Sequence, residues 1–321
     1  MAFLQVNHLK KYFPVTGGIF LRRKGYVYAL DDVTFSLEKG ETLGIVGESG
    51  CGKTTLGRCV MGLYPPTGGS VSVNGRDISK TDARARKRLT LNLQMIFQDP
   101  FESLDPRQTI KQILEEKFIV HKRKTKDLDR RILALLEQVG LPADALTKFP
   151  HEFSGGQRQR IGIARAISLE PDLIVCDEPV SALDVSVQSK ILNLLLDLQQ
   201  KMGLAYLFIS HDLSVVKHIS DRIAVMYMGK IVETAGAQEL YNHALHPYTR
   251  ALLSSIPIPD PENRSHRIVL KGEVPSVENP PPGCRFNTRC PHARDICVEK
   301  EPVLIANNDD SEHLTACHFF H

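Results

Sequence analysis

Residues 47–55, GESGCGKTT, combine three glycines, one lysine and two threonines directly after an apolar run. The first eight fit the pattern G-x-x-x-x-G-K-[S/T], in which glycines let backbone N–H groups approach phosphate oxygens. The N-terminus of a following helix adds a favourable dipole. We expect Lys53 to reach the outer phosphates of a nucleoside triphosphate and Thr54 to bind Mg²⁺. The expected ligands in this phosphate loop are Gly47, Ser49, Gly50, Cys51, Gly52, Lys53, Thr54 and Thr55.

Two adjacent carboxylates follow a second apolar run, LIVC, at Asp177 and Glu178. A carboxylate at a strand end can orient Mg²⁺ or its water ligands, which is the role we expect for Asp177. Side chains alternate in direction at a strand end, so Glu178 points elsewhere and can deprotonate an attacking water. Alone, such a run is most often a plain strand end. Its position downstream of the phosphate loop favours the catalytic interpretation.

A second candidate anion site lies in FSGGQRQRIGIARA, residues 153–166. Ser154, Gly155 and Gly156 open a helix and supply a hydroxyl, two accessible amides and a helix N-terminus. One triphosphate does not need two such sites more than a hundred residues apart in the chain. We therefore expect this site to cap the γ-phosphate of a nucleotide bound to another subunit.

The elements that position these residues indicate an α/β fold. Short apolar runs at 41–47, 171–179 and 204–212 predict buried strands, and residues 188–200 predict a helix between two of them. Strands that are apolar on both faces and separated by helices are typical of a parallel sheet. In such sheets ligands bind at the carboxyl ends of the strands, where the candidate residues lie.

The chain between about residues 98 and 160 is predicted to be helical. Ile132, Leu135, Leu136 and Val139 are spaced i, i+3, i+4 and i+7, which is one stripe of an amphipathic helix. Prolines and polar residues over 254–265 indicate a linker. We expect a nucleotide-binding domain at 1–255, with a helical subdomain at about 98–160, and a C-terminal extension at 256–321.

Taken together, these motifs resemble the ATP-binding cassette (ABC) family, in which SGGQ is the signature motif. The resemblance covers roughly residues 1–255. It implies a P-loop ATPase with a RecA-like parallel sheet core, an antiparallel β part and an inserted helical subdomain. It also implies that two subunits enclose two ATP molecules, so that Ser154 to Gln157 of one subunit meet the nucleotide of the other.

The resemblance assigns roles to further residues. It implies that Gln98, in MIFQDP, senses Mg²⁺ and water and contacts a transmembrane partner. Asp184, the last residue of SALD, belongs to a loop that crosses the dimer interface, and His211 matches a switch histidine that contacts the γ-phosphate. An aromatic residue is expected to stack on adenine: Tyr12 lies in the usual place, and Tyr26 and Tyr28 remain open choices.

The C-terminal part narrows the resemblance to the ATPases of dipeptide and oligopeptide importers, which are similar at HPYTRALLSSIP, GEVPS and NPPPGCRFNTRCP. The resemblance then covers essentially the whole chain. It implies a heterodimer with a related ATPase, two membrane permease subunits and an extracytoplasmic substrate-binding protein. It implies that the complex takes up peptides, with nickel chelates and haem as open alternatives. Two alternative classes of function are a soluble cassette that acts on nucleic acid or ribosomes and a redox-sensing regulator.

Cys284, Cys290, Cys297 and Cys317 are spaced C-x5-C-x6-C-x19-C in a tail that is too small to build its own core. This pattern predicts a metal centre, without the C-x-x-C hairpins of common zinc ribbons. Four thiolates suit either zinc or an iron–sulfur cluster, and the resemblance to peptide-importer ATPases favours [4Fe-4S]. Four free thiols are the alternative without a metal.

Composition limits the possible partners and location. Forty Lys and Arg against 37 Asp and Glu give a formal charge of +3 among 321 residues, which is too small to indicate a nucleic-acid surface. The sequence shows no signal-peptide pattern and no apolar stretch approaching 18 residues. We expect a cytosolic protein that reaches the inner face of the membrane only through its partners.

Overall fold

The computed structural model describes residues 2–17, 22–79, 83–99, 103–122, 127–256, 268–270, 272–307 and 312–320. The chain forms two compact units. Unit 1 comprises residues 1–37, 42–80 and 210–321, and unit 2 comprises residues 38–41 and 81–209. Most of the predicted linker at 254–265 lies outside the described residues.

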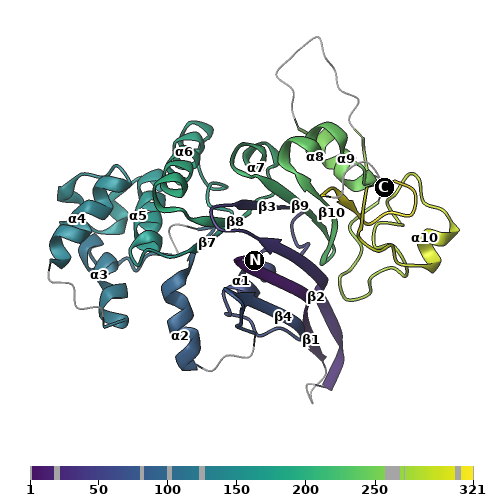
Figure 1. Cartoon of the computed structure of the whole chain (residues 1–321), viewed down its shortest axis with the longest axis horizontal. Helices are drawn as coiled ribbons and strands as arrows, with labels where there is room; N and C mark the ends of the chain where they lie inside the picture. The colour runs from purple at the N-terminus through teal and green to yellow at the C-terminus, as the bar shows by residue number, and fades with distance from the viewer. Residues whose placement is uncertain are drawn as a thin grey trace, which may run out of the picture. The chain divides into compact units, whose positions relative to one another are not determined.

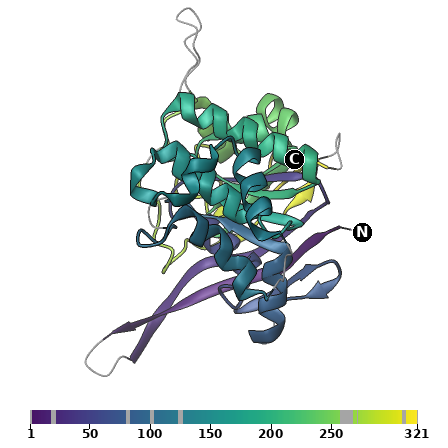
Figure 2. The same cartoon turned by 90° about the vertical axis from the view of Figure 1, so that its left-hand side faces the viewer.

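Unit 1 contains an antiparallel sheet with strand order β2-β1-β4-β5. Its strands are β1 (Leu4–Gly17), β2 (Arg22–Leu37), β4 (Gly68–Val73) and β5 (Arg76–Asp77). Leu4, Val6 and Leu9 of β1 are fully buried, which anchors this part of the strand in the core. Beyond the residues paired with β4, β1 and β2 continue as a long two-stranded ribbon (Figure 2).

The other strands of unit 1 form a mixed arrangement in the order β3-β9-β10-β12-β11. β3 (Thr42–Val46) is parallel to β9 (Arg222–Tyr227), and β9 is antiparallel to β10 (Lys230–Gly236). β12 (Leu314–Thr315) pairs with β10 and with β11 (Ile305–Ala306). The helices of this unit are α1 (Lys53–Val60), α7 (Leu213–Ile219), α8 (Ala237–His243), α9 (Pro247–Ser254) and α10 (Asp295–Glu299).

Unit 2 contains three parallel strands in the order β6-β7-β8. They are β6 (Leu93–Ile96), β7 (Leu173–Asp177) and β8 (Ala205–Ile209), and every residue in them is buried. Between β7 and β8 runs α6 (Val185–Met202), which ends at Gly203 in the left-handed conformation. The strands predicted at 41–47, 171–179 and 204–212 are confirmed as β3, β7 and β8, the helix predicted at 188–200 is confirmed as part of α6, and the α/β fold is confirmed.

The helices of unit 2 include α2 (Ala83–Asn92), α3 (Ile110–Val120), α4 (Leu128–Gln138) and α5 (Gly155–Ile167). The predicted amphipathic stripe is confirmed, because Ile132, Leu135, Leu136 and Val139 are all buried. α3, α4 and α5 lie side by side (Figure 1). The guanidinium of Arg160 on α5 donates to the Val139 carbonyl at the end of α4 over 2.5 Å, which ties the two helices together.

The C-terminal segment of unit 1 packs against the rest of that unit. Phe286 is 1% exposed, and its ring lies 5.3 Å from Tyr227 and 5.4 Å from Tyr248, measured between centroids. β12 adds to the edge of β10. Burial of an aromatic side chain and strand pairing therefore contribute to holding this segment.

Candidate functional site

The phosphate loop has a backbone that only glycine accommodates at two positions. Gly47 and Gly52 have φ angles of +154° and +108°. A Cβ atom on Gly47 would lie 2.2 Å from the Met226 carbonyl oxygen, and one on Gly52 would lie 2.3 Å from the Ala29 carbonyl oxygen. These close approaches fold the loop tightly between β3 and α1. At the start of α1, Gly52 provides no side-chain cap, so the first-turn N–H groups are of the kind that bind anions.

Lys53 is held inside this loop. Its ammonium donates to the carbonyl oxygens of Gly47 and Glu48 over 2.7 and 3.1 Å, and the residue is 5% exposed. Cys51 is also buried, and burial raises the pKa of its thiol, which argues against a nucleophile at this position. The loop thus presents one cation among backbone amides, an arrangement suited to a polyphosphate.

The candidate base Glu178 and the candidate Mg²⁺ ligands Asp177 and Gln98 lie together at the end of β7. Asp177 is the last residue of the strand and is 3% exposed. Glu178 follows with a φ of +48°. The direction of its side chain is therefore set by this left-handed backbone, whereas the sequence predicted that the alternation of side chains along a strand would set it. Its carboxylate accepts a hydrogen bond from the Gln98 amide over 3.0 Å. Strained non-glycine residues cluster at functional sites.

The signature-like residues are at the N-terminus of α5, as predicted. Ser154 is the N-cap and forms a capping box with Gln157: the Gln157 N–H donates to the Ser154 hydroxyl, and the Ser154 N–H donates to the Gln157 side chain. Glycine at 156 has a packing reason that sequence reasoning missed. A Cβ there would lie 2.5 Å from Val187 of α6.

Asp184, the last residue of SALD, and His211 are both exposed. Asp184 is the N-cap residue of α6 without a side-chain cap bond, and the Gln188 side chain donates to the Val180 and Leu183 carbonyls, bracing the loop. His211 follows Ser210, whose N–H donates to the Ile45 carbonyl of β3 over 3.1 Å. The predicted switch histidine therefore lies beside the strand that leads into the phosphate loop.

Tyr12, Tyr26 and Tyr28 form one cluster on the β1–β2 ribbon. The Tyr12 ring centroid lies 4.8 Å from that of Tyr28 and 6.3 Å from that of Tyr26. The Tyr12 hydroxyl donates to Asp31 over 2.6 Å, and burial together with this bond raises the pKa of Tyr12. All three residues are partly exposed, and the contacts among their rings do not favour one of them, so the choice among them stays open.

The four C-terminal cysteines line one small cavity of about 20 Å³. Burial raises the pKa of Cys284 to about 11 and also raises the pKa of Cys290, so these thiols do not ionise readily by themselves. The described part of the chain contains no group of three or more His, Cys, Asp or Glu side chains placed to hold a metal ion. Four thiols that line one cavity are donors of the kind that thiolate-bound centres use. These side chains are not, however, placed to hold a single metal ion.

Sequence reasoning missed a link between the phosphate loop and the C-terminal segment. Arg289 donates to both carboxylate oxygens of Glu48, over 2.7 and 3.1 Å, and these hydrogen bonds raise the pKa of Arg289. The Glu48 N–H donates to the Tyr248 hydroxyl over 2.9 Å. Tyr248 lies in HPYTRALLSSIP and Arg289 in NPPPGCRFNTRCP, and the arginine directly before Cys290 is the feature of the sequence that could have indicated this link.

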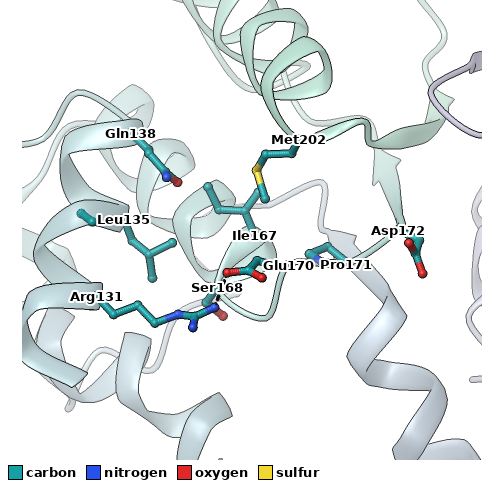
Figure 3. Close-up of a pocket in the computed structure, with 10 residues that line it drawn as sticks. Arg131, Leu135, Gln138, Ile167, Ser168, Glu170, Pro171, Asp172 and Met202 are labelled. Atoms are coloured by element: carbon teal, nitrogen blue, oxygen red, sulfur yellow. Dashed lines mark hydrogen bonds and ion pairs between the residues drawn. The ribbon is translucent and has the colours of Figure 1, made fainter. Parts of the chain in front are cut away.

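Unit 2 also contains a cavity of about 540 Å³ between α4, the turn after α5 and the end of α6 (Figure 3). Arg131 and Glu170 form an ion pair across one side of it, at 2.5 Å. Leu135, Ile167 and Met202 contribute apolar surface. Gln138, Ser168 and Asp172 add polar groups, but none of the predicted site residues lines this cavity.

The fold, the phosphate loop and the strand-end carboxylates define a P-loop ATPase. Comparison with known proteins specifies the family. Residues 30–181 match the family described as ABC transporter, and residues 232–297 match the one described as oligopeptide/dipeptide transporter, C-terminal region. No helix among the described residues combines the length and the apolar character that crossing a membrane requires.

Relatives match over nearly the whole chain. The oligopeptide transport ATP-binding protein AppF of Bacillus subtilis (strain 168) is 53% identical, covering 99% of this chain and 98% of its own. The dipeptide transport ATP-binding protein DppF of Escherichia coli (strain K12) is 49% identical, covering 98% and 93%. A solved dimer of the ATP-binding cassette MJ0796, in a post-hydrolysis state bound to ADP and Pi, aligns with a TM-score of 0.64. It is 26% identical and covers 73% of this chain and 98% of its own.

The chain belongs to the ABC transporter family, as one of its ATP-binding, ATP-hydrolysing subunits.

Proposed function

We propose that this chain energises the uptake of dipeptides or oligopeptides across the cytoplasmic membrane. The observation that carries the proposal is the match of residues 232–297 to the C-terminal region of oligopeptide and dipeptide transporters. The relatives AppF and DppF are named for oligopeptide and dipeptide transport. We place the nucleotide-binding domain at 1–255, its helical subdomain at about 98–160, and the extension at 256–321.

In this proposal the phosphate loop binds ATP. Lys53 neutralises the outer phosphates, backbone amides of 47–55 surround them, and one of the clustered tyrosines, with Tyr12 preferred, stacks on adenine. Glu178 accepts a proton from water, the water oxygen bonds to the γ-phosphorus, and the bond to the ADP oxygen breaks. Gln98 donates to the Glu178 carboxylate over 3.0 Å and so leaves it oriented to accept that proton.

Mg²⁺ accompanies ATP in this site. The Thr54 hydroxyl, the Asp177 carboxylate and the Gln98 amide are oxygen donors of the kind that Mg²⁺ prefers, and Asp177 is nearly buried at the end of β7. The ion neutralises charge on the phosphates when bound. The protein residues therefore need only hold the ion and orient the water.

We propose that ATP is enclosed between this chain and a related ATPase. The capping box of Ser154 and Gln157 leaves the α5 N-terminus at the surface, where Gly155 and Gly156 can approach the γ-phosphate of the partner's nucleotide. The exposed Asp184 loop and His211 complete the contact. The remaining partners are two membrane permease subunits and an extracytoplasmic substrate-binding protein, which place this chain at the inner face of the membrane.

The substrate is tested by uptake of labelled dipeptide in cells whose native copy carries Glu178→Gln. We expect uptake to be lost while the membrane stays energised, because the transporter can no longer complete its ATP cycle. Uptake of a nickel chelate and of haem is measured in the same cells. Normal dipeptide uptake with loss of one of these would contradict the peptide assignment and identify the alternative cargo.

We further propose that Cys284, Cys290, Cys297 and Cys317 hold a [4Fe-4S] cluster, with zinc as the alternative. Their convergence on one cavity supports a shared centre, and a cluster of several irons does not require the close thiol spacing of a single ion. Protein purified without oxygen is expected to contain about four iron and four sulfide per chain. Cys284→Ser should lose both, and Cys59→Ala, in α1, should retain them. Stoichiometric zinc without iron, or no metal at all, would reject the cluster.

A further inference from the structure

The C-terminal segment forms an ion pair with the phosphate loop at one residue, Glu48. Arg289 makes two parallel hydrogen bonds to the Glu48 carboxylate, with distances of 2.7 and 3.1 Å. The Arg289 side chain is only 8% exposed, and the Glu48 side chain is 29% exposed. A bidentate, charge-assisted pair that is shielded from water fixes geometry more strongly than an exposed ion pair does.

The backbone of Glu48 is fixed by a second group. Its N–H donates to the hydroxyl of Tyr248, which is fully buried. Tyr248 is placed in turn by His246, whose imidazole accepts the Tyr248 N–H over 3.1 Å. Burial lowers the pKa of His246 to about 4, so the imidazole stays neutral and keeps accepting this bond at neutral pH. The N–H groups of Leu245 and His246 both donate to the buried Glu233 carboxylate.

A neighbouring arginine, Arg285, is linked to the same loop through the backbone of residues 228 and 229. Arg285 donates to the Met228 carbonyl over 3.0 Å and pairs with Asp31. The next residue, Gly229, donates its N–H to the Cys51 carbonyl of the phosphate loop over 2.9 Å. Arg285 directly follows Cys284, and Arg289 directly precedes Cys290. Of these two side chains, Arg289 contacts the phosphate loop directly at Glu48, and Arg285 contacts Met228, the neighbour of the Gly229 that bonds to Cys51.

Residues of the C-terminal segment also line the space beside this loop. Residues 274–277 and residues 48–51 share a cavity of about 260 Å³. The Tyr28 N–H donates to the Val277 carbonyl over 3.1 Å, which fixes this stretch to β2. The loop is therefore enclosed on the side of Glu48 by residues far along the chain.

We propose that Arg289 is a positioning residue for ATP: through Glu48 it holds the phosphate loop in the form that binds the phosphates. This inference rests on the proposed function of residues 47–55 as the ATP-phosphate site. A loop that must be ordered at the moment of binding loses affinity, because the conformational entropy of ordering is then taken from the binding free energy. Removing the ion pair between Arg289 and Glu48, the clamp on this loop, should therefore weaken nucleotide binding more than it slows the chemical step.

The test measures MgATP binding by the purified full-length chain and ATP hydrolysis in the assembled transporter. Arg289→Gln and Glu48→Gln are each expected to raise the Kd for MgATP about tenfold. For Arg289→Gln, which lies outside the phosphate loop, kcat at saturating ATP should stay within about twofold of wild type. Arg289→Lys keeps the charge without the paired donors and should fall between wild type and Arg289→Gln. Arg294→Gln is the matched control, because Arg294 is exposed and stacks on Phe319, 4.3 Å from the ring centroid.

The double variant Glu48→Gln with Arg289→Gln separates a direct clamp from two unrelated effects. If each residue acts through the other, the double variant binds MgATP no more weakly than either single variant. The inference would be overturned if the two substitutions had additive effects on the free energy of MgATP binding, or if each single variant had a Kd for MgATP within twofold of wild type. If Arg289→Gln fails to fold, as judged by thermal unfolding, Glu48→Gln decides the question from the phosphate-loop side. Failure of the wild-type chain itself to bind MgATP would instead reject the proposed function.

Discussion

Glu178→Gln is expected to reduce ATP hydrolysis by at least about 100-fold in the assembled transporter while ATP binding stays within a few-fold of wild type. General-base catalysis by a positioned side chain contributes about 10²- to 10⁴-fold, and glutamine cannot accept the proton from water. The substitution preserves the size of the side chain and leaves the buried Asp177 in place. ATP hydrolysis is measured as the release of inorganic phosphate. ATP binding is measured by equilibrium titration with MgATP.

Gln98→Ala gives a graded comparison for the same site. It removes the hydrogen bond to the Glu178 carboxylate and should reduce hydrolysis less than loss of the carboxylate does. Glu137→Gln is the matched control, because Glu137 is exposed on α4 and lies outside the candidate site. Hydrolysis by Glu178→Gln within tenfold of wild type would exclude Glu178 as the base and direct attention to another group near the γ-phosphate.

Gly52→Ala is expected to destabilise the chain by about 3 kcal/mol or more and to abolish measurable MgATP binding. The added Cβ would lie 2.3 Å from the Ala29 carbonyl oxygen, a backbone atom that cannot swing aside. The φ of +108° adds strain for any residue with a Cβ. Gly47→Ala should behave similarly, because its Cβ would meet the Met226 carbonyl oxygen at 2.2 Å.

Gly50→Ala is the matched comparison within the same loop. Gly50 also has a positive φ, +80°, but a Cβ there would meet no atom within 4 Å. We expect a loss of about 1 to 2 kcal/mol, from backbone strain alone. Free energies of unfolding come from denaturant titration, and MgATP affinity is measured in parallel. Equal losses at positions 50 and 52 would show that close backbone contact does not determine the glycine requirement.

The sequence by itself determined the local features of this protein. The phosphate loop could be identified because its glycines, Lys53 and Thr54 are consecutive, and the buried strands because their side chains are apolar on both faces. The stripe on α4 follows from a period of 3.6 residues, which packing against α5 then preserves. Each of these depends on residues within about a dozen positions of one another.

Tertiary structure decided the contacts that join distant parts of the chain. Gln98 and Glu178 are 80 positions apart, Glu48 and Tyr248 are 200 apart, and Glu48 and Arg289 are 241 apart. A single hydrogen bond between distant residues leaves no periodic pattern in one sequence. The positive φ of Glu178 could not be predicted from the sequence either. It arises where the backbone turns out of β7 while the Glu178 N–H donates to the Ile209 carbonyl. The sequence therefore specified which chemical groups are available, and folding decided which of them touch.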